Sequence, residues 1–287
     1  MKMVSEVLGV ARSNLHVRAR RRGDWTDGRR YRQPLGDAEL VGEIATEIAA
    51  LPSYGYRRAQ ALINRHRDGD GRQRVNHKRV YRVMRDHHLL LRRHTGRPVD
   101  TRSHHGRIAV SQSDRRWCSD GFEIACDNRE RVRIAFALDC CDREAMSWVA
   151  TTGGITGDMV RDLMVEAVEA RFGTVAPAQP IEWLTDNGSP YIARDTRSFA
   201  RELGLEPLTT AIASPQSNGM AEAFVKTFKR DYAERMDRRD AFTVLRQLDA
   251  AFEHYNEVHP HQALKMLSPR MFRRRAAELS ITVCPEI

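Results

Sequence analysis

The sequence predicts an α/β domain preceded by a small all-helical domain, and three observations carry this prediction. Residues 1–110 hold 24 basic and 11 acidic side chains, whereas residues 111–287 hold 23 basic and 27 acidic. Before residue 90 the apolar residues recur at helical spacing, and strand-like runs begin only after residue 115. From there strand-like and helical runs alternate, which is typical of a mixed α/β layer.

Composition limits the classes of protein that this chain can belong to. Its 287 residues are 41% hydrophobic and 30% charged, with 47 Lys+Arg against 38 Asp+Glu and a formal charge of +9. No apolar run reaches 18 residues and the N-terminus lacks a signal-peptide core, so we expect no membrane span and a cytoplasmic location. A cationic front part predicts a polyanionic partner, with nucleic acid as the first candidate. Arginine dominates the basic residues, which suits phosphate and guanine contacts, but a GC-rich genome produces the same bias.

Neither cysteine nor histidine usage indicates a zinc site. The five cysteines, at 118, 126, 140, 141 and 284, are odd in number and show no CxxC spacing. We therefore expect reduced, unconnected thiols. The eleven histidines lack cysteine partners at ligand spacing, so we expect them at the surface or near DNA.

The first segment, 1–36, is interpreted as a basic N-terminal unit with a linker. Val4, Val7 and Leu8 could share one face of a short helix, and the stretch Gly23–Gly36 is polar and rich in turn residues. The segment is either a fragment of a larger helical unit or a flexible basic arm.

Residues 37–95 are predicted to form a helix-turn-helix domain. Asp37 is a good N-cap for a first helix that Pro52 ends, and a second helix follows the Tyr54–Tyr56 turn. Asn76 can cap a third helix with a buried stripe of Val80, Val83 and Met84 and basic residues on its other faces. Three short helices with a basic last helix favour DNA binding. A small bundle with a solvated basic helix is the alternative.

After a polar linker at 96–113, the segment 114–275 is predicted to be the α/β domain, and 276–287 a tail. The expected strands and helices follow one another along the chain: strands 116–124, 132–139 and 146–151, helix 156–171, strand 181–185, helix 196–203 and strand 206–208. Three meandering strands followed by alternating helices and strands give the order of a ribonuclease-H-like fold.

Three acidic residues stand at positions suited to one site. Asp120 lies near the middle of the first strand, Asp186 directly follows the fourth, and Glu222 lies in the first turn of a helix. Thirty-five residues separate Asp186 from Glu222. Taken singly, each acid is better explained as a solvated turn or helix-start residue, and the helix dipole alone favours a Glu at the position of Glu222.

Their flanking residues resemble the integrase-core transposases of bacterial insertion sequences, the second-frame product, whose core is shared with retroviral integrases. The resemblance rests on several motifs in order across residues 37–275: the Tyr54–Arg58 turn, Thr185–Gly188, Ser214–Gly219, Lys229 seven residues after Glu222, Tyr255-Asn256 and Pro260-His261. Three features depart from the pattern. Phe122 replaces a small polar residue, His259 replaces an Arg, and the zinc-binding N-terminal module of retroviral integrases is absent.

The resemblance implies a DNA transposase that cuts element ends and joins their 3′-hydroxyls to target DNA. Asp120, Asp186 and Glu222 are then the catalytic, metal-binding residues. Carboxylates are hard ligands for Mg²⁺, with Mn²⁺ as a substitute, and two ions about 3.5–4 Å apart can serve the attacking and leaving oxygens. We expect Asp120 to bridge both ions and the other two acids to complete one side each. Asp127, Asp139 and Asp142 are interpreted as turn or strand-end residues.

Further expectations concern DNA and partners. The expected DNA-contacting residues lie on the third helix, beside Asp186 and on the helix of Glu222: Lys78, Arg79, Arg82, Asn187, Lys226 and Lys229. Gly188 and Gly219 would let the backbone approach DNA closely. The run from Arg270 to Arg275 could reach the DNA backbone or could be a solvated charge run. We expect double-stranded DNA, further copies of the chain and, through a frameshifted fusion, the upstream-frame protein as partners. A non-catalytic DNA-binding regulator and a ribonuclease-H-type nuclease are the rival functions.

Overall fold

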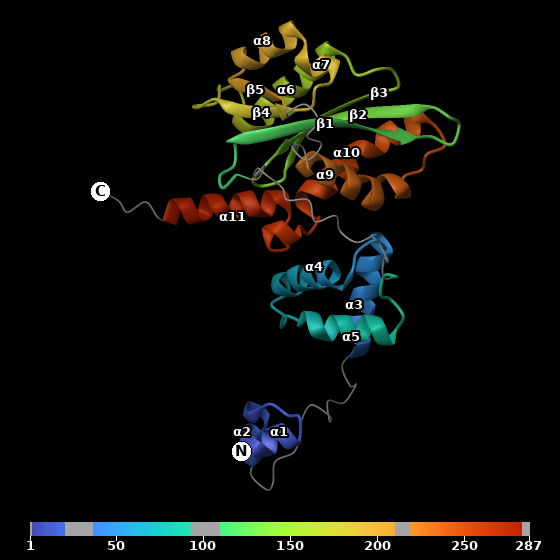
Figure 1. The fold of residues 1–287 in the computed structure, drawn as a ribbon. Coiled ribbons are helices and arrows are strands. Elements are labelled where there is room, and N and C mark those ends of the chain that lie inside the picture. The colour runs from blue at the N-terminus through green and yellow to red at the C-terminus, as the bar shows by residue number, and fades with distance from the viewer. Residues whose placement is uncertain (1, 21–36, 93–109, 210–218, 283–287) are drawn as a thin grey trace. The chain divides into compact units, whose positions relative to one another are not determined.

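The computed structural model describes residues 2–20, 37–92, 110–209 and 219–282, and Figure 1 shows the arrangement of its elements. By their contacts the residues group into two compact units, 1–42 and 43–287. None of the described helices is long and apolar enough to cross a membrane. The expected linker at Gly23–Gly36, most of the linker at 96–113 and the motif Ser214–Gly219 up to residue 218 lie outside the described residues.

The N-terminal segment forms two short helices where one was expected, α1 (Lys2–Val7) and α2 (Arg12–Ala19). Val4, Val7 and Leu8 are all exposed, and α1 buries no residue. Leu8 lies beyond the end of α1, and the three apolar side chains pack into no core within this segment.

Three helices follow, α3 (Asp37–Ala50), α4 (Tyr56–Gly69) and α5 (His77–Asp86). Asp37 is the first residue of α3, a place where an acidic side chain suits the helix dipole. Asn76 caps α5 as expected, because its side chain accepts a hydrogen bond from the backbone N–H of Lys78 at 2.8 Å. The predicted buried stripe of α5 is confirmed: Val80, Val83 and Met84.

A buried asparagine fixes the start of α5 against α4. Asn64 Oδ1 accepts from the backbone N–H of Val75 at 2.8 Å, and its Nδ2 donates to the carbonyl of the same residue at 3.1 Å. Both backbone groups of Val75 are thereby satisfied next to the cap of α5, so the basic helix keeps a defined direction.

A mixed sheet forms the centre of the α/β part of the chain, from residue 110 onward, with strand order β3-β2-β1-β4-β5 among the described residues. β1 pairs antiparallel with β2 and parallel with β4, and β4 pairs parallel with β5. The bounds lie within one or two residues of those predicted: β1 (Arg116–Ala125), β2 (Arg131–Asp139), β3 (Ala145–Thr151), β4 (Ile181–Thr185) and β5 (Leu205–Thr209). The order is that of a ribonuclease-H-like fold, as the sequence predicts.

Helices cover both faces of this sheet (Figure 1). The helices follow in order as α6 (Gly157–Phe172), α7 (Ser189–Ile192), α8 (Arg194–Glu202), α9 (Gly219–Asp231), the short η2 (Ala233–Arg235), α10 (Ala241–Glu257), η3 (Gln262–Leu264) and α11 (Pro269–Thr282). On one face Trp117 packs with residues of α6, and on the other Phe122 packs with Phe224 and Phe228 of α9 and Phe252 of α10. Side chains alternate along a strand, so Asp120 lies on the same face of β1 as Phe122, the face that α9 covers.

The expectation that the histidines lie at the surface is wrong for His259, which is completely buried. Its Nδ1 lies 2.7 Å from the hydroxyl of Tyr54, and burial lowers the pKa of His259 well below its usual value, so the ring is neutral. Asp231, also fully buried, pairs with Arg58 at 3.1 Å and with Arg230 at 2.6 Å. His259 Nδ1 lies 3.9 Å from Asp231. Although a neutral His259 stands where the family has an Arg, Asp231 is still paired with two arginines.

The four cysteines within the described residues, Cys118, Cys126, Cys140 and Cys141, are free thiols, as expected. Cys284 lies outside the described residues.

Candidate functional site

The first carboxylate, Asp120, stands on a rigid central strand. It lies opposite Phe136 of β2 in the antiparallel ladder and is half-buried. Its Oδ1 accepts a hydrogen bond from the backbone N–H of Gly121 at 2.7 Å. Burial raises the pKa of Asp120, and the carboxylates of Asp186 and Glu222 raise this pKa further, which places both within electrostatic range of Asp120.

The second carboxylate follows β4 directly. Asp186 Oδ1 accepts from the backbone N–H of Gly188 at 2.9 Å, which closes a tight turn at the strand end. A Cβ atom at position 188 would lie 2.9 Å from this same carboxylate oxygen. A larger residue here would therefore force the Asp186 carboxylate to shift.

Glu222 lies in the first turn of α9, as predicted, with an exposed side chain. Its carboxylate lies 3.7 Å from the Lys226 Nζ, one helical turn away. Among the residues that the structure describes, no three acidic, histidine or cysteine side chains lie close enough together to hold a metal ion as they stand. Asp120, Asp186 and Glu222 thus share one region without forming a closed ligand set.

The expected DNA-contacting residues lie at accessible positions. On α5, Lys78 and Arg79 are exposed and Arg82 is half-exposed. Asn187 is exposed beside Asp186. On α9, the Lys226 side chain is 80% exposed, and Lys229 Nζ lies 6.0 Å from the centre of the Phe122 ring. The aromatic residue that departs from the family pattern therefore faces a cation.

The C-terminal arginines form ion pairs that the sequence did not predict. Arg270 contacts Glu144 at 2.8 Å and Glu253 at 2.8 Å, and Arg273 contacts Glu144 at 3.0 Å. These ion pairs attach α11 to the turn between β2 and β3 and to α10.

Sequence reasoning missed a buried ion cluster. Asp139 and Asp142 do lie at a strand end and a turn, as interpreted, but both are completely buried. Arg171, on the apolar face of α6, donates from one nitrogen to both carboxylate oxygens of Asp142, at 2.9 and 3.0 Å. The available signal was the spacing of Arg171, which continues the apolar positions Ala167 and Val168 of α6.

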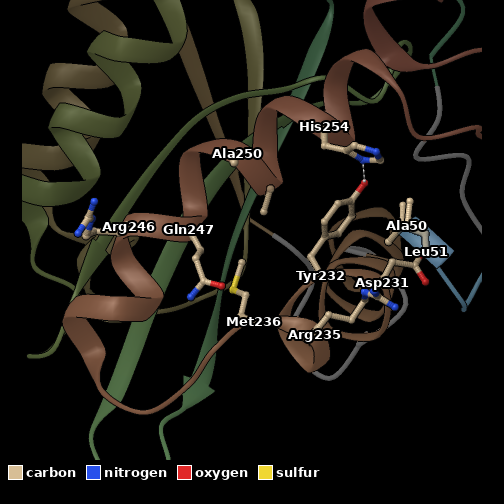
Figure 2. A pocket seen from close by; sticks show the side chains of 11 residues that line it. Ala50, Leu51, Asp231, Tyr232, Arg235, Met236, Arg246, Gln247, Ala250 and His254 are labelled. Carbon is tan, nitrogen blue, oxygen red and sulfur yellow. Dashed lines mark hydrogen bonds between the residues drawn. The ribbon is translucent and has the colours of Figure 1, made fainter.

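A pocket of about 410 Å³ lies beside the end of α9 (Figure 2). His254 and Tyr232 are joined in it by a hydrogen bond of 3.0 Å. The described residues that line it do not include Asp120, Asp186 or Glu222. The pocket is therefore separate from the carboxylates.

Comparison with known proteins defines the class. Residues 110–215 and residues 203–269 each match a family described as "Integrase core domain". Residues 37–97 match "HTH-like domain", and residues 1–24 match "IS2 transposase InsD, N-terminal domain". Together with the strand order, these matches define an integrase-core transposase with a helix-turn-helix-like domain.

Full-length relatives narrow the class. The chain is 54% identical over 289 residues to the transposase InsD of insertion element IS2A/D/F/H/I/K from Escherichia coli, covering 100% of this chain and 96% of that one. The InsD transposase of element IS2-9 from Escherichia coli strain K12 is also 54% identical, with 94% of its length covered. The chain belongs to the InsD family of IS2 insertion-element transposases.

Solved structures with similar folds are more distant. The catalytic core domain of BIV integrase is 18% identical with a TM-score of 0.42, covering 58% of this chain and 99% of that one. The catalytic domain of Mos1 mariner transposase is 16% identical with a TM-score of 0.43, covering 57% and 82%. The HTLV-2 integrase catalytic core domain, solved in complex with magnesium, is 12% identical with a TM-score of 0.44, covering 55% and 95%. At this distance they add nothing to the family assignment.

Proposed function

We propose that this chain cuts DNA at the ends of an insertion element and joins the resulting 3′-hydroxyls to target DNA, with Asp120, Asp186 and Glu222 as its catalytic residues. The observation that carries the proposal is the convergence of three acids from separate segments. Asp120 lies on β1, and Asp186 follows the neighbouring strand β4. Glu222 lies in the first turn of α9, the helix that covers the face of β1 on which Asp120 lies. The raised pKa of Asp120, caused in part by the other two, supports their proximity.

The three side chains fit divalent metal ions by their chemistry. All three donors are carboxylate oxygens, the hard ligands that Mg²⁺ and Mn²⁺ accept, and like charges gathered in one region favour a cation between them. We propose that Asp120, Asp186 and Glu222 together would hold two such ions. Bound there, such ions activate the attacking oxygen and stabilise charge on the departing one. Because the three acids do not lie close enough together to hold a metal ion as they stand, we propose that their side chains move together when metal ions bind.

Other residues bind and orient the DNA. Lys226 lies beside Glu222 and carries a mostly exposed ammonium group, so it can contact a phosphate next to the scissile bond. Lys229, at i+7 from Glu222 on the same helix face, extends this contact. Helix α5 presents Lys78 and Arg79 to the element end, while its buried stripe fixes it to the helical domain.

The proposed partners are double-stranded DNA, at element ends and target, and further copies of the chain that bring two ends together. The upstream-frame protein, as a fusion or a separate chain, is a further proposed partner. Since the substrate is bacterial chromosomal or plasmid DNA, we place the activity in the cytoplasm.

One assay separates this function from its two rivals. The full chain is incubated with labelled element-end DNA, a target plasmid and Mg²⁺, and in parallel with an RNA–DNA hybrid. A transposase nicks the end and transfers the strand to the plasmid. A regulator with a relic core binds the end without cutting, and a nuclease cleaves the hybrid without strand transfer. Either of these two outcomes would overturn the proposal.

A further inference from the structure

A buried hydrogen bond links the strand of Asp120 to the turn that follows Asp186. The Ser119 hydroxyl donates to the phenol oxygen of Tyr191 across 3.0 Å. Ser119 is completely buried and immediately precedes Asp120 in β1. Tyr191 lies in α7, five residues after Asp186, and its half-buried ring packs against the cluster around Trp117.

This bond lies where the backbone ladder between the two strands stops. The paired residues of β1 and β4 end at Cys118 and Leu184. Continuing the same register places Asp120 opposite Asp186, two positions beyond the last pair. Since no ladder pairing reaches this point, the spacing of the two carboxylates depends on other connections. The bond from Ser119 to Tyr191 crosses between the segments at this level.

Tyr191 is in turn packed into the Asp186 turn. Its backbone N–H donates to the carbonyl of Gly188 at 3.0 Å, and Gly188 donates to the Asp186 carboxylate at 2.9 Å. A Cβ on residue 188 would lie 3.4 Å from a ring carbon of Tyr191 as well as against Asp186. Tyr191 and the Asp186 carboxylate are thus connected through one intervening residue, Gly188.

We propose that Ser119 and Tyr191 are positioning residues, whose hydrogen bond sets the spacing between Asp120 and Asp186 for metal binding. This inference rests on the proposed function. Two carboxylates repel each other, so a frame that holds them at the required spacing in advance lowers the cost of bringing them together on an ion. A bond of this kind acts on the free protein, and its effect is therefore visible before DNA is bound.

The test measures metal binding and cleavage separately on the full chain. Tyr191→Phe keeps the ring and removes the phenol oxygen, and Ser119→Ala removes the donor. For each variant and for the double variant, Mn²⁺ is titrated without DNA while the melting temperature is followed, and Mg²⁺ half-saturation of end cleavage is measured. Residues that hydrogen-bond a metal ligand directly typically affect metal affinity by about 10–100-fold. The Ser119–Tyr191 bond acts one step further from the carboxylates, so we expect the lower end of this range, about a tenfold higher half-saturating Mn²⁺ for each single variant. The double variant should match the singles, because one bond is lost in all three.

Matched controls come from the same domain. Ser147→Ala removes a buried serine that donates to the carbonyl of Leu163 at 2.8 Å, and Tyr232→Phe removes a phenol bonded to His254. Both should lower stability without changing the Mn²⁺ titration. An unchanged titration in folded Tyr191→Phe, or equal shifts in the controls, overturns the inference even if Ser119→Ala fails to fold. If the wild-type chain shows no metal-induced shift, or Asp120→Asn retains it, the proposed metal site fails as well, which distinguishes the two failures.

Discussion

Replacing Arg171 by Met tests the buried ion cluster that attaches α6 to the turn after β2. The Arg171 and Asp142 side chains are both 0% exposed, and Glu144, 3.5 Å from the guanidinium, is 7% exposed. Because these charges are shielded from solvent, no screening by water reduces their interaction. Removing one partner of a buried pair leaves an uncompensated charge and costs about 3–5 kcal/mol. At about 2–4 °C per kcal/mol for a domain of this size, the melting temperature should fall by about 6–20 °C.

The stability lost in Arg171→Met should be smaller at acidic pH, because the pKa of Asp139 is raised in the folded protein. Burial, followed by the neighbouring Asp142, raises the pKa of Asp139 from 3.8 to about 6, and Arg171 lowers it in part. Without Arg171 this pKa rises further. A carboxyl whose folded pKa is raised is favoured protonated in the folded state, so its contribution is present at low pH and lost as pH rises through the folded pKa. The variant should therefore gain stability relative to wild type between pH 7 and pH 5.

The assay is thermal and urea unfolding of both proteins at pH 7 and pH 5. Arg161→Met is the matched control, since Arg161 lies on the same helix and pairs with Asp158, whose side chain is 81% exposed. A surface pair of this kind contributes about 0–1 kcal/mol. If Arg171→Met costs no more than Arg161→Met, the cluster does not stabilise the domain and the reasoning is refuted.

Three further predictions concern DNA binding and local structure. Replacing Arg79 and Arg82 by Ala should flatten the slope of log affinity against log salt by about one to two units, since each phosphate that the protein neutralises releases counterions and contributes about 0.9 to the slope. An unchanged slope in a folded protein would exclude this face of α5 as the DNA-contacting surface. Asn76→Ala should lower the unfolding free energy by about 1 kcal/mol through loss of the helix cap, with Asn76→Asp as the variant that restores it in urea unfolding. Gly188→Ala should force the carboxylate of Asp186 to shift, because a Cβ would lie 2.9 Å from it, and so should impair cleavage while gel-shift binding persists; normal cleavage would contradict the turn geometry.

Most of the fold could be predicted from the sequence because buried positions recur with the period of the strand or helix that carries them. The strand over Ile181–Thr185 is predicted with its observed bounds, since a short apolar run ends abruptly at a polar Asp-Asn-Gly turn. The order of strands and helices along the chain then leaves few possible sheet topologies. In the one observed, the parallel pairing of β1 with β4 brings Asp120 next to the strand that Asp186 follows. The acidic residues could be chosen from the sequence because two of them stand at element boundaries, Asp186 after β4 and Glu222 in the first turn of α9, and because motifs flank the three.

What the sequence could not give is the partner of each buried polar group. His259 is expected at the surface or near DNA because the sequence shows no metal-ligand spacing around it, yet it is buried against the hydroxyl of Tyr54, some 200 residues away. Ser119 and Tyr191 are 72 residues apart and carry no sequence pattern that links them. The sequence does not tell whether a hydroxyl or an imidazole is exposed to solvent or hydrogen-bonded in the interior. Only the folded structure distinguishes these two states. Arg171 is the one case with a usable signal, which sequence reasoning missed: a charge at an apolar helix position requires a buried counter-charge.

The central claim, that Glu222 acts with Asp120 and Asp186 on phosphodiester bonds, is tested most directly by Mg²⁺-dependent cleavage of labelled element-end DNA by Glu222→Gln. The substitution keeps the size and hydrogen-bonding reach of the side chain and removes its charge. Several kcal/mol of charge stabilisation at the reacting oxygens should be lost, and about 4 kcal/mol corresponds to about a thousandfold slower cleavage. Asp127→Asn, an exposed turn residue, is the control and should cut at the wild-type rate. A folded Glu222→Gln that binds end DNA and cuts it at a near-normal rate would contradict the account.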